Sequence, residues 1–146
     1  MNLCISLNKK NSIMKKNADT LHLVLKSQWY DLIASGIKTE EYREIKPYWQ
    51  KRLIDYKALS VYVVKTYKAM LCHQFLVHGN LEPHIDDAPH MFLRGYKQVI
   101  FRRGYHRDAP SMTFAIKDIC FGHGKPEWGA PTHQEVFIIK LGKRIA

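Results

Sequence analysis

The segment GIKTEEYR, residues 36–43, decides the fold, and it lies within the longer stretch LHLVLKSQWYDLIASGIKTEEYREI, residues 21–45. Leucines alternate with other residues over positions 21–25, a pattern typical of a strand with one buried face. The apolar spacing then becomes helical, so residues 27–35 predict a short helix with Ser27 as its cap and Gly36 at its left-handed end. Residues 38–45 predict a second strand, whose charge favours a sheet edge or a face toward a wet groove.

A second short helix is predicted directly after this strand. Pro47 suits the first helical position, and Tyr48, Trp49, Leu53 and Ile54 follow with helical spacing. The aromatic pair Tyr48 and Trp49 is typical of a helix packed onto a core, although such a pair can also stack a nucleobase.

Strand signals return after residue 95. Residues 99–103, 113–120 and 135–141 predict three strands, and a Gly- and Pro-rich loop at residues 122–131 separates the last two. Several strands with an early pair of helices indicate an α+β fold, a small mixed or antiparallel β-barrel flanked by short helices.

The length of 146 residues favours a single domain. We expect residues 1–19 to form a flexible basic tail and residues 20–146 to form the domain. Within it, residues 55–95 form an elaboration that is hard to place. Its patterns suggest a strand at residues 61–64, a helix at residues 67–77 and a loop at residues 79–89.

The charge of the chain favours polyanionic partners. Lysine and arginine number 23 against 13 acidic residues, a formal net charge of +10. Such an excess supports contact with phosphates, while an anionic membrane surface or simple solubility are the other interpretations. We expect no membrane insertion, because no apolar run approaches about 20 residues, and the first residues lack a signal-peptide pattern.

Cysteine and histidine usage predicts a cytoplasmic protein without a metal or other cofactor. The three cysteines are odd in number and far apart, which fits free thiols in a reducing compartment. The densest histidine region lacks the paired spacing of a zinc site. Its members are Cys72, His73, His78, His84 and His90.

The pattern G-x-K-x-x-E-x-R at residues 36–43, placed after a strand and a short helix, resembles the signature of the ASCH superfamily. The resemblance covers residues 21–48 and 99–145. It implies a PUA-like barrel that binds RNA or a modified nucleoside in a cleft beside the barrel. Lys38, Glu41 and Arg43 would line that cleft.

The chemistry of these residue types suits such a ligand even apart from the family resemblance. Lys38 offers a point charge, or a base if desolvated; Glu41 can accept hydrogen bonds from a nucleobase; Arg43 offers a planar fork of donors. On a regular strand Glu41 and Arg43 share a face and Lys38 points to the other. They converge only if Lys38 lies in the turn before the strand, or at a bulge. The alternative is an exposed strand carrying ion pairs.

The resemblance also raises an enzymatic alternative. One branch of the superfamily hydrolyses acetylated cytidine with a lysine and a threonine of this motif, and ribonuclease activity is associated with others. Lys38 matches the lysine, but Glu41 occupies the threonine position, and Thr39 is not its equivalent. Lys38 and Glu41 are therefore the candidate catalytic residues, with Glu41 as a general base in place of a nucleophile.

Two further segments are candidates for ligand binding. Arg102, Arg103 and Tyr105 form a basic and aromatic segment, suited to phosphate contact and base stacking or else to a solvated hairpin end. Trp128 lies in the 122–131 loop, where it can line the mouth of a cleft or plug the end of the barrel. A protein-interaction or inhibitory module is the third functional class.

Overall fold

The computed structural model describes residues 19–61 and 92–146. The chain divides into two compact units, Met1–Glu44 with Gly95–Ala146, and Ile45–Arg94. The helix and loop predicted at residues 67–77 and 79–89 lie outside the described residues, as does all of the predicted tail except Asp19.

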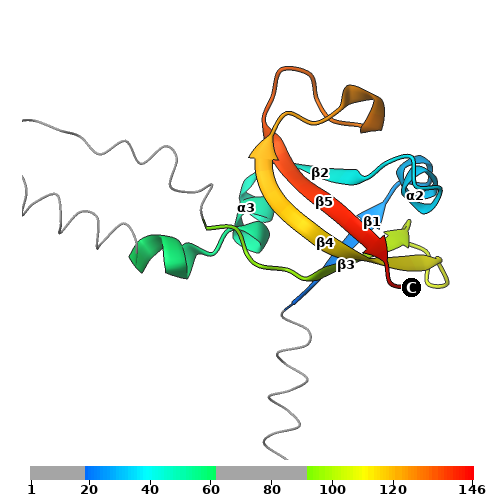
Figure 1. The fold of residues 1–146 in the computed structure, drawn as a ribbon, viewed down its shortest axis with the longest axis horizontal. Helices are drawn as coiled ribbons and strands as arrows, with labels where there is room; N and C mark the ends of the chain where they lie inside the picture. Colours follow the sequence, from blue (N-terminus) through cyan, green and yellow to red (C-terminus); the bar gives the residue numbers. More distant parts are fainter. Residues whose placement is uncertain (1–18, 62–91) are drawn as a thin grey trace, which may run out of the picture. The chain divides into compact units, whose positions relative to one another are not determined.

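The first unit is a curled, mixed sheet that forms a half-barrel (Figure 1). Its five strands run in the order β1-β3-β4-β5-β2; β1 pairs with β3 in parallel, and the other neighbours are antiparallel. The strands are β1 Thr20–Leu25, β2 Glu40–Glu44, β3 Gln98–Arg103, β4 Ser111–Gly122 and β5 Val136–Arg144. All of the strands predicted at residues 21–25, 99–103, 113–120 and 135–141 are confirmed. The arrangement is compatible with a small α+β barrel-like fold.

The predicted strand at residues 38–45 is shorter than expected. It spans Glu40–Glu44, so Lys38 lies in the turn before it. Its predicted edge position is confirmed, because β2 ends the strand order. Glu41 and Tyr42 are nevertheless buried in it, whereas Glu44 at its end is exposed.

The alternating leucines of β1 form part of the hydrophobic core of the sheet. Leu21, Leu23 and Leu25 are 1%, 2% and 3% exposed, and Val99 and Phe101 of the neighbouring β3 are fully buried. In contrast, β5 buries consecutive residues, which requires both faces of the strand to be covered.

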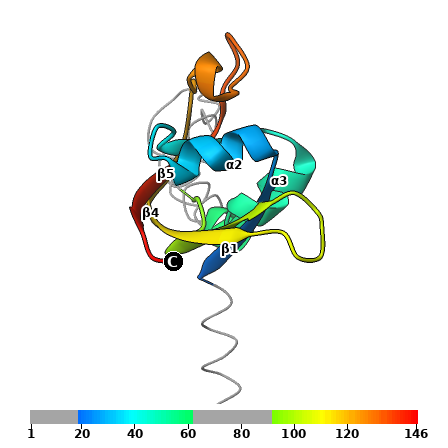
Figure 2. The same ribbon diagram turned by 90° about the vertical axis from the view of Figure 1, so that its right-hand side faces the viewer.

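Helix α2, Ser27–Ala34, links the edge strands β1 and β2 (Figure 2). The prediction that Ser27 caps it is wrong by one residue: Lys26 is the extended cap, without a side-chain bond, and its carbonyl accepts the first helical N–H groups. Gly36 has a φ of 81°, as predicted. Beyond it, the Lys38 N–H donates to the Leu32 carbonyl at 3.0 Å, which fixes Lys38 under the end of the helix.

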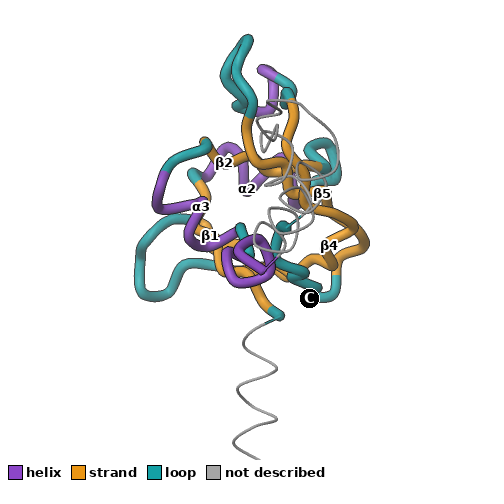
Figure 3. The backbone as a smooth tube through the Cα atoms, turned by 90° about the vertical axis from the view of Figure 1, so that its left-hand side faces the viewer, coloured by secondary structure: helices purple, strands orange, loops and turns teal. Residues whose placement is uncertain are grey.

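The connection between β4 and β5 contains a single short 3-10 turn, η2, Pro126–Trp128 (Figure 3). Gly129 follows with a φ of 93°, in the left-handed region that glycine tolerates best. The turn stands in the loop predicted at residues 122–131.

In the second unit, α3 spans Pro47–Leu53 and begins with the predicted proline. Leu53 is buried in it, whereas Ile54 follows the helix and forms a bridge with Leu93. Residues 56–61 are helical, so the strand predicted at residues 61–64 is wrong at its first position, and its remainder lies outside the described residues. No helix in the described part of the chain is long and apolar enough to cross a membrane.

Candidate functional site

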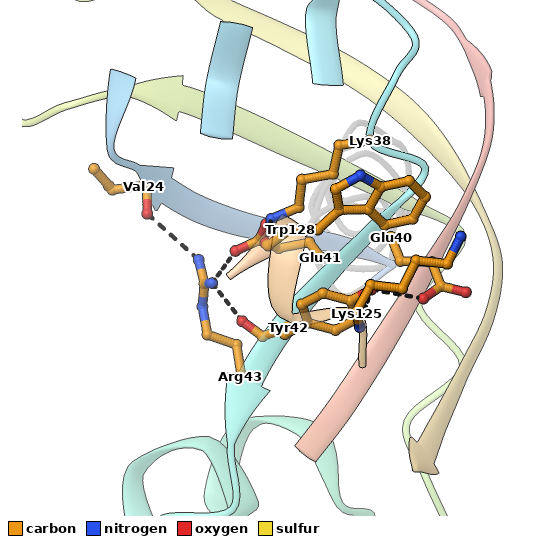
Figure 4. A network of polar contacts seen from close by, with 8 residues as sticks. All are labelled: Val24, Lys38, Glu40, Glu41, Tyr42, Arg43, Lys125 and Trp128. Atoms are coloured by element: carbon orange, nitrogen blue, oxygen red, sulfur yellow. Dashed lines mark hydrogen bonds and ion pairs between the residues drawn. The ribbon is translucent and has the colours of Figure 1, made fainter. Parts of the chain in front are cut away.

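Lys38 lies at the centre of a polar network under η2 (Figure 4). Its Nζ atom is 2.7 Å from Glu41 Oε2 and donates a hydrogen bond of 2.7 Å to the Trp128 carbonyl oxygen. Because Lys38 precedes β2 instead of belonging to it, its side chain can meet Glu41 despite the opposite parity of their positions. The structure therefore adopts one of the two arrangements that allow the motif to converge.

Burial sets this ion pair apart from surface salt bridges. Lys38 is 2% exposed and Glu41 is 3% exposed. Withdrawing each charge from water costs several kcal/mol, and mutual attraction seldom returns a net gain in stability. Buried, perturbed charges of this kind concentrate at functional sites.

Aromatic rings surround the ammonium group. Lys38 Nζ lies 4.7 Å from the ring centroid of Trp29 and 5.3 Å from that of Tyr42, within the range of cation–π attraction. Burial lowers the pKa of Lys38 below its usual 10.5, and the nearby Glu41 carboxylate opposes this shift. Lys38 thus releases its proton more readily than a surface lysine.

Arg43 completes the network and joins the two edges of the sheet. Its guanidinium donates to Glu41 Oε1, to the Tyr42 carbonyl at 2.7 Å and to the Val24 carbonyl at 3.4 Å. Val24 belongs to β1 and Arg43 to β2, the first and last strands of the sheet. Arg43 therefore bridges the opening of the half-barrel at the level of Glu41.

One acceptor of the network lacks a regular hydrogen bond. Glu41 Oε2 is buried and accepts none within the described residues, although Lys38 Nζ lies at ion-pair distance. Buried acceptors are normally satisfied, so Oε2 retains capacity for a donor from a ligand.

The η2 turn is held over Lys38 by a second anchor. The Lys125 N–H donates to the Tyr42 hydroxyl at 3.1 Å, and that hydroxyl donates to Glu40 Oε2 at 2.9 Å. Burial raises the pKa of Tyr42, so its hydroxyl keeps the proton that it donates. The turn is thereby held at two points, Tyr42 of β2 and Lys38 just before that strand.

Two glycines allow the turn to approach closely. A Cβ on Gly129 would lie 2.8 Å from the Trp29 ring, and one on Gly124 would lie 2.7 Å from the Tyr42 ring. The Trp29 and Tyr42 rings that surround the Lys38 ammonium therefore also pack against the backbone of the turn.

Arg102, Arg103 and Tyr105 lie in a separate arrangement. Arg102 donates to the carbonyls of His106 and Arg107 in its own hairpin loop. Arg103 forms two hydrogen bonds with Asp31 of α2, at 2.9 and 3.0 Å. Only Tyr105 presents its ring to solvent, at 88% exposure. The two arginines thus shape the loop and its attachment to α2, with contacts that do not reach Lys38 or Glu41.

Trp128 contributes to the site through its backbone. Its half-buried ring packs against a small core of Tyr42, Ala130, Val136 and Ile138. Lys125 Nζ lies 4.1 Å from the centroid of the same ring. The sequence left open whether this ring lines a cleft or plugs the barrel; the structure instead makes its carbonyl oxygen the atom that meets Lys38.

Sequence reasoning did not assign Trp29 and Tyr42 to the site. Trp29 belongs to the apolar face of α2, and such a residue normally reads as core. Tyr42 lies between Glu41 and Arg43 in the sequence, and this position within the motif was the signal that could have assigned it to the site. No sequence pattern links the Lys125 N–H to Tyr42, because backbone donors carry no residue signature.

Among residues 19–61 and 92–146, no group of three or more His, Cys, Asp or Glu side chains is arranged to hold a metal ion. In comparisons with known proteins, no family model, no curated protein and no solved structure matches the chain.

Proposed function

We propose that this chain is a PUA-like domain of the ASCH type that binds RNA or a modified nucleobase at the Lys38–Glu41–Arg43 cluster. The observation that carries the proposal is the burial of Lys38 and Glu41 as a contacting pair inside an aromatic surround. A domain that needed only stability gains little from such a pair. In a ligand site, the same pair holds its charges and hydrogen-bonding groups in fixed positions and directions.

The chemistry of the cluster suits a nucleobase. A base offers hydrogen-bond donors and carbonyl acceptors on one edge, and a π-face for stacking. Glu41 Oε2 supplies an acceptor without a regular hydrogen bond, Lys38 supplies a donor, and Trp29 supplies a flat ring beside them. The formal net charge of +10 adds a general attraction for the phosphate backbone.

Fluorescence anisotropy with a short labelled RNA tests this proposal. We expect binding that weakens as salt rises, because phosphate contacts release counterions. Glu41→Gln should reduce affinity about tenfold by weakening a charge-assisted hydrogen bond to the base, whereas Glu135→Gln, at an exposed position, should not. Equal affinity of both folded variants would contradict a site at Glu41.

Metal-independent catalysis at the same cluster is the second candidate, either RNA cleavage or removal of an acyl group from a modified nucleoside. The lowered pKa of Lys38 favours it, because a lysine that releases its proton more readily can act as a base. Glu41, 2.7 Å away, is placed to exchange that proton.

Mass spectrometry separates catalysis from binding. Short RNAs, some carrying acetylated cytidine, would be incubated with wild type and with Lys38→Ala. Fragments or deacetylated product formed only by wild type would establish turnover through Lys38. Unchanged RNA with folded protein would leave binding as the better account for these substrates.

A further inference from the structure

The Trp128 carbonyl oxygen occupies the acceptor position on Lys38. It receives a 2.7 Å hydrogen bond from Nζ, and with this contact Lys38 is 2% exposed. A ligand cannot reach Nζ while η2 remains where it is. Any binding at Lys38 therefore begins with displacement of the Trp128 carbonyl.

We propose that η2 is a plug that covers Lys38 and is displaced by the ligand. In the closed protein, the Trp128 carbonyl occupies the position that a neutral carbonyl group of the ligand takes when it binds. This inference rests on the proposed function and specifies the ligand group that Lys38 receives. The ligand group takes over the hydrogen bond from Nζ as the turn moves away.

The surroundings of Lys38 favour a carbonyl over a phosphate. The Glu41 carboxylate already lies 2.7 Å from Nζ, and it also pairs with Arg43. A phosphate in the place of the Trp128 oxygen would bring a second anion beside that carboxylate, in a buried region where repulsion is poorly screened. A neutral carbonyl avoids this repulsion.

Arg43, like Lys38, donates hydrogen bonds to neutral carbonyl oxygens. Besides Glu41, its guanidinium donates to the carbonyls of Tyr42 and Val24. Backbone carbonyl oxygens thus accept from both cations of the cluster. The region is suited to neutral oxygen acceptors, and phosphate contacts of an RNA would fall on exposed basic residues outside it.

Opening of the plug must break a small set of contacts. The Lys38 hydrogen bond, the Tyr42 hydroxyl and the packing of the Trp128 ring hold the turn in place, and Gly129 provides the left-handed conformation that lets it turn back. An alanine at position 129 would strain that conformation and collide with the Trp29 ring. Gly129→Ala should therefore favour the open turn.

Covalent labelling of lysines tests the plug without a ligand. Wild type, Gly129→Ala and Tyr42→Phe would be treated briefly with an acetylating reagent, and mass spectrometry would give the rate at each lysine. Lys143, exposed on β5, is the internal standard. We expect Lys38 to react at least about tenfold more slowly than Lys143 in wild type, since reaction requires local opening.

In Gly129→Ala the Lys38 rate should rise about tenfold, from the strain of a non-glycine residue at positive φ. Tyr42→Phe removes the acceptor of the Lys125 N–H together with the donor to Glu40, and it should raise the Lys38 rate roughly threefold. If Gly129→Ala does not fold, the Lys38 rate in Tyr42→Phe alone tests the plug. A Lys38 rate equal to that of Lys143 in wild type, or unchanged in the folded variants, would overturn the plug.

Hydrogen exchange of the Lys125 backbone amide tests whether the ligand group is a neutral carbonyl. Uridine, which carries carbonyls and no phosphate, should accelerate exchange of the Lys125 amide about threefold by lifting the turn, whereas inorganic phosphate should leave it unchanged. Opening by phosphate, or by neither compound, would overturn the carbonyl assignment. RNA binding that weakens in Glu41→Gln but occurs without turn opening would remove this inference and leave the proposed function, whereas turn opening without RNA binding would leave the plug and remove the proposed function.

Discussion

Lys38 and Trp128 are separated by 90 positions in the sequence, yet the ammonium of one donates a 2.7 Å hydrogen bond to the carbonyl of the other. This contact joins the turn before β2 to the connection between β4 and β5. It places a buried cation directly beneath a loop with little regular structure. The relationship between these two residues organises the candidate site and explains why Lys38 is closed to solvent.

Breaking the buried pair should be costly to stability. Glu41→Leu leaves Lys38 without its counter-charge, and the free energy of unfolding should fall by about 3–5 kcal/mol. The double variant Lys38→Met with Glu41→Leu should recover about 2 kcal/mol or more, because it removes the buried ammonium, and the Arg43 guanidinium that also loses this carboxylate is partly exposed. Urea unfolding of the three proteins measures this. Equal stability of the single and double variants would contradict a cost from a buried Lys38 ammonium without its carboxylate.

The stability contribution of Lys38 should depend on pH. Its folded-state pKa is lowered from 10.5 by burial, so the unfolded chain binds the proton more tightly. The resulting penalty is complete below the folded pKa and is relieved as pH rises through it toward 10.5. Wild type should therefore gain stability relative to Lys38→Met as pH rises toward 10.5. A difference that stays flat or moves in the opposite direction would contradict the lowered pKa.

The approach of the β4–β5 connection to Tyr42 should depend on Gly124. A Cβ there would lie 2.6 Å from that of Ala130 and 2.7 Å from the Tyr42 ring, so Gly124→Ala should cost about 1–3 kcal/mol through overpacking. Gly95→Ala is the matched control, since its Cβ meets nothing within 4 Å. Thermal unfolding of the two variants compares them. A neutral Gly124→Ala would mean that the loop is not packed against Tyr42.

The exposed Tyr105 ring should matter for RNA and not for folding. At 88% exposure, its replacement by alanine should leave the unfolding midpoint unchanged. Loss of a stacked base would weaken single-stranded RNA binding by about 1–3 kcal/mol. Anisotropy and thermal unfolding on the same preparation separate the two effects. Full RNA affinity in Tyr105→Ala would remove this residue from the proposed binding surface.

Local patterns predicted most of the strand framework. The alternation of Leu21, Leu23 and Leu25 indicated β1, and Gly36 indicated where α2 ends, because both signals act over a few neighbouring residues. The boundary of β2 was less accurate: Lys38 and Thr39 are polar enough for an edge strand, but the hydrogen bond from the Lys38 N–H to Leu32 keeps that position in the turn.

The candidate site was predictable only in part. The motif identified Lys38, Glu41 and Arg43, and the structure brings these three together. Their burial was not predictable, because it depends on η2 returning from far along the chain to cover them. The same tertiary contacts recruit Trp29 and the Trp128 carbonyl, neither of which has a local signature of its role.

The most direct test of the account locates the ligand on the protein. In an NMR titration of isotope-labelled protein with short RNA and with free nucleosides, we expect the largest shifts at the indole N–H of Trp29 and at the amides of Lys125 and Gly129. Those groups surround Lys38, so their movement would place the ligand at the buried cluster. Binding with shifts confined to other surfaces, and none at these three residues, would contradict a ligand site at Lys38, Glu41 and Arg43.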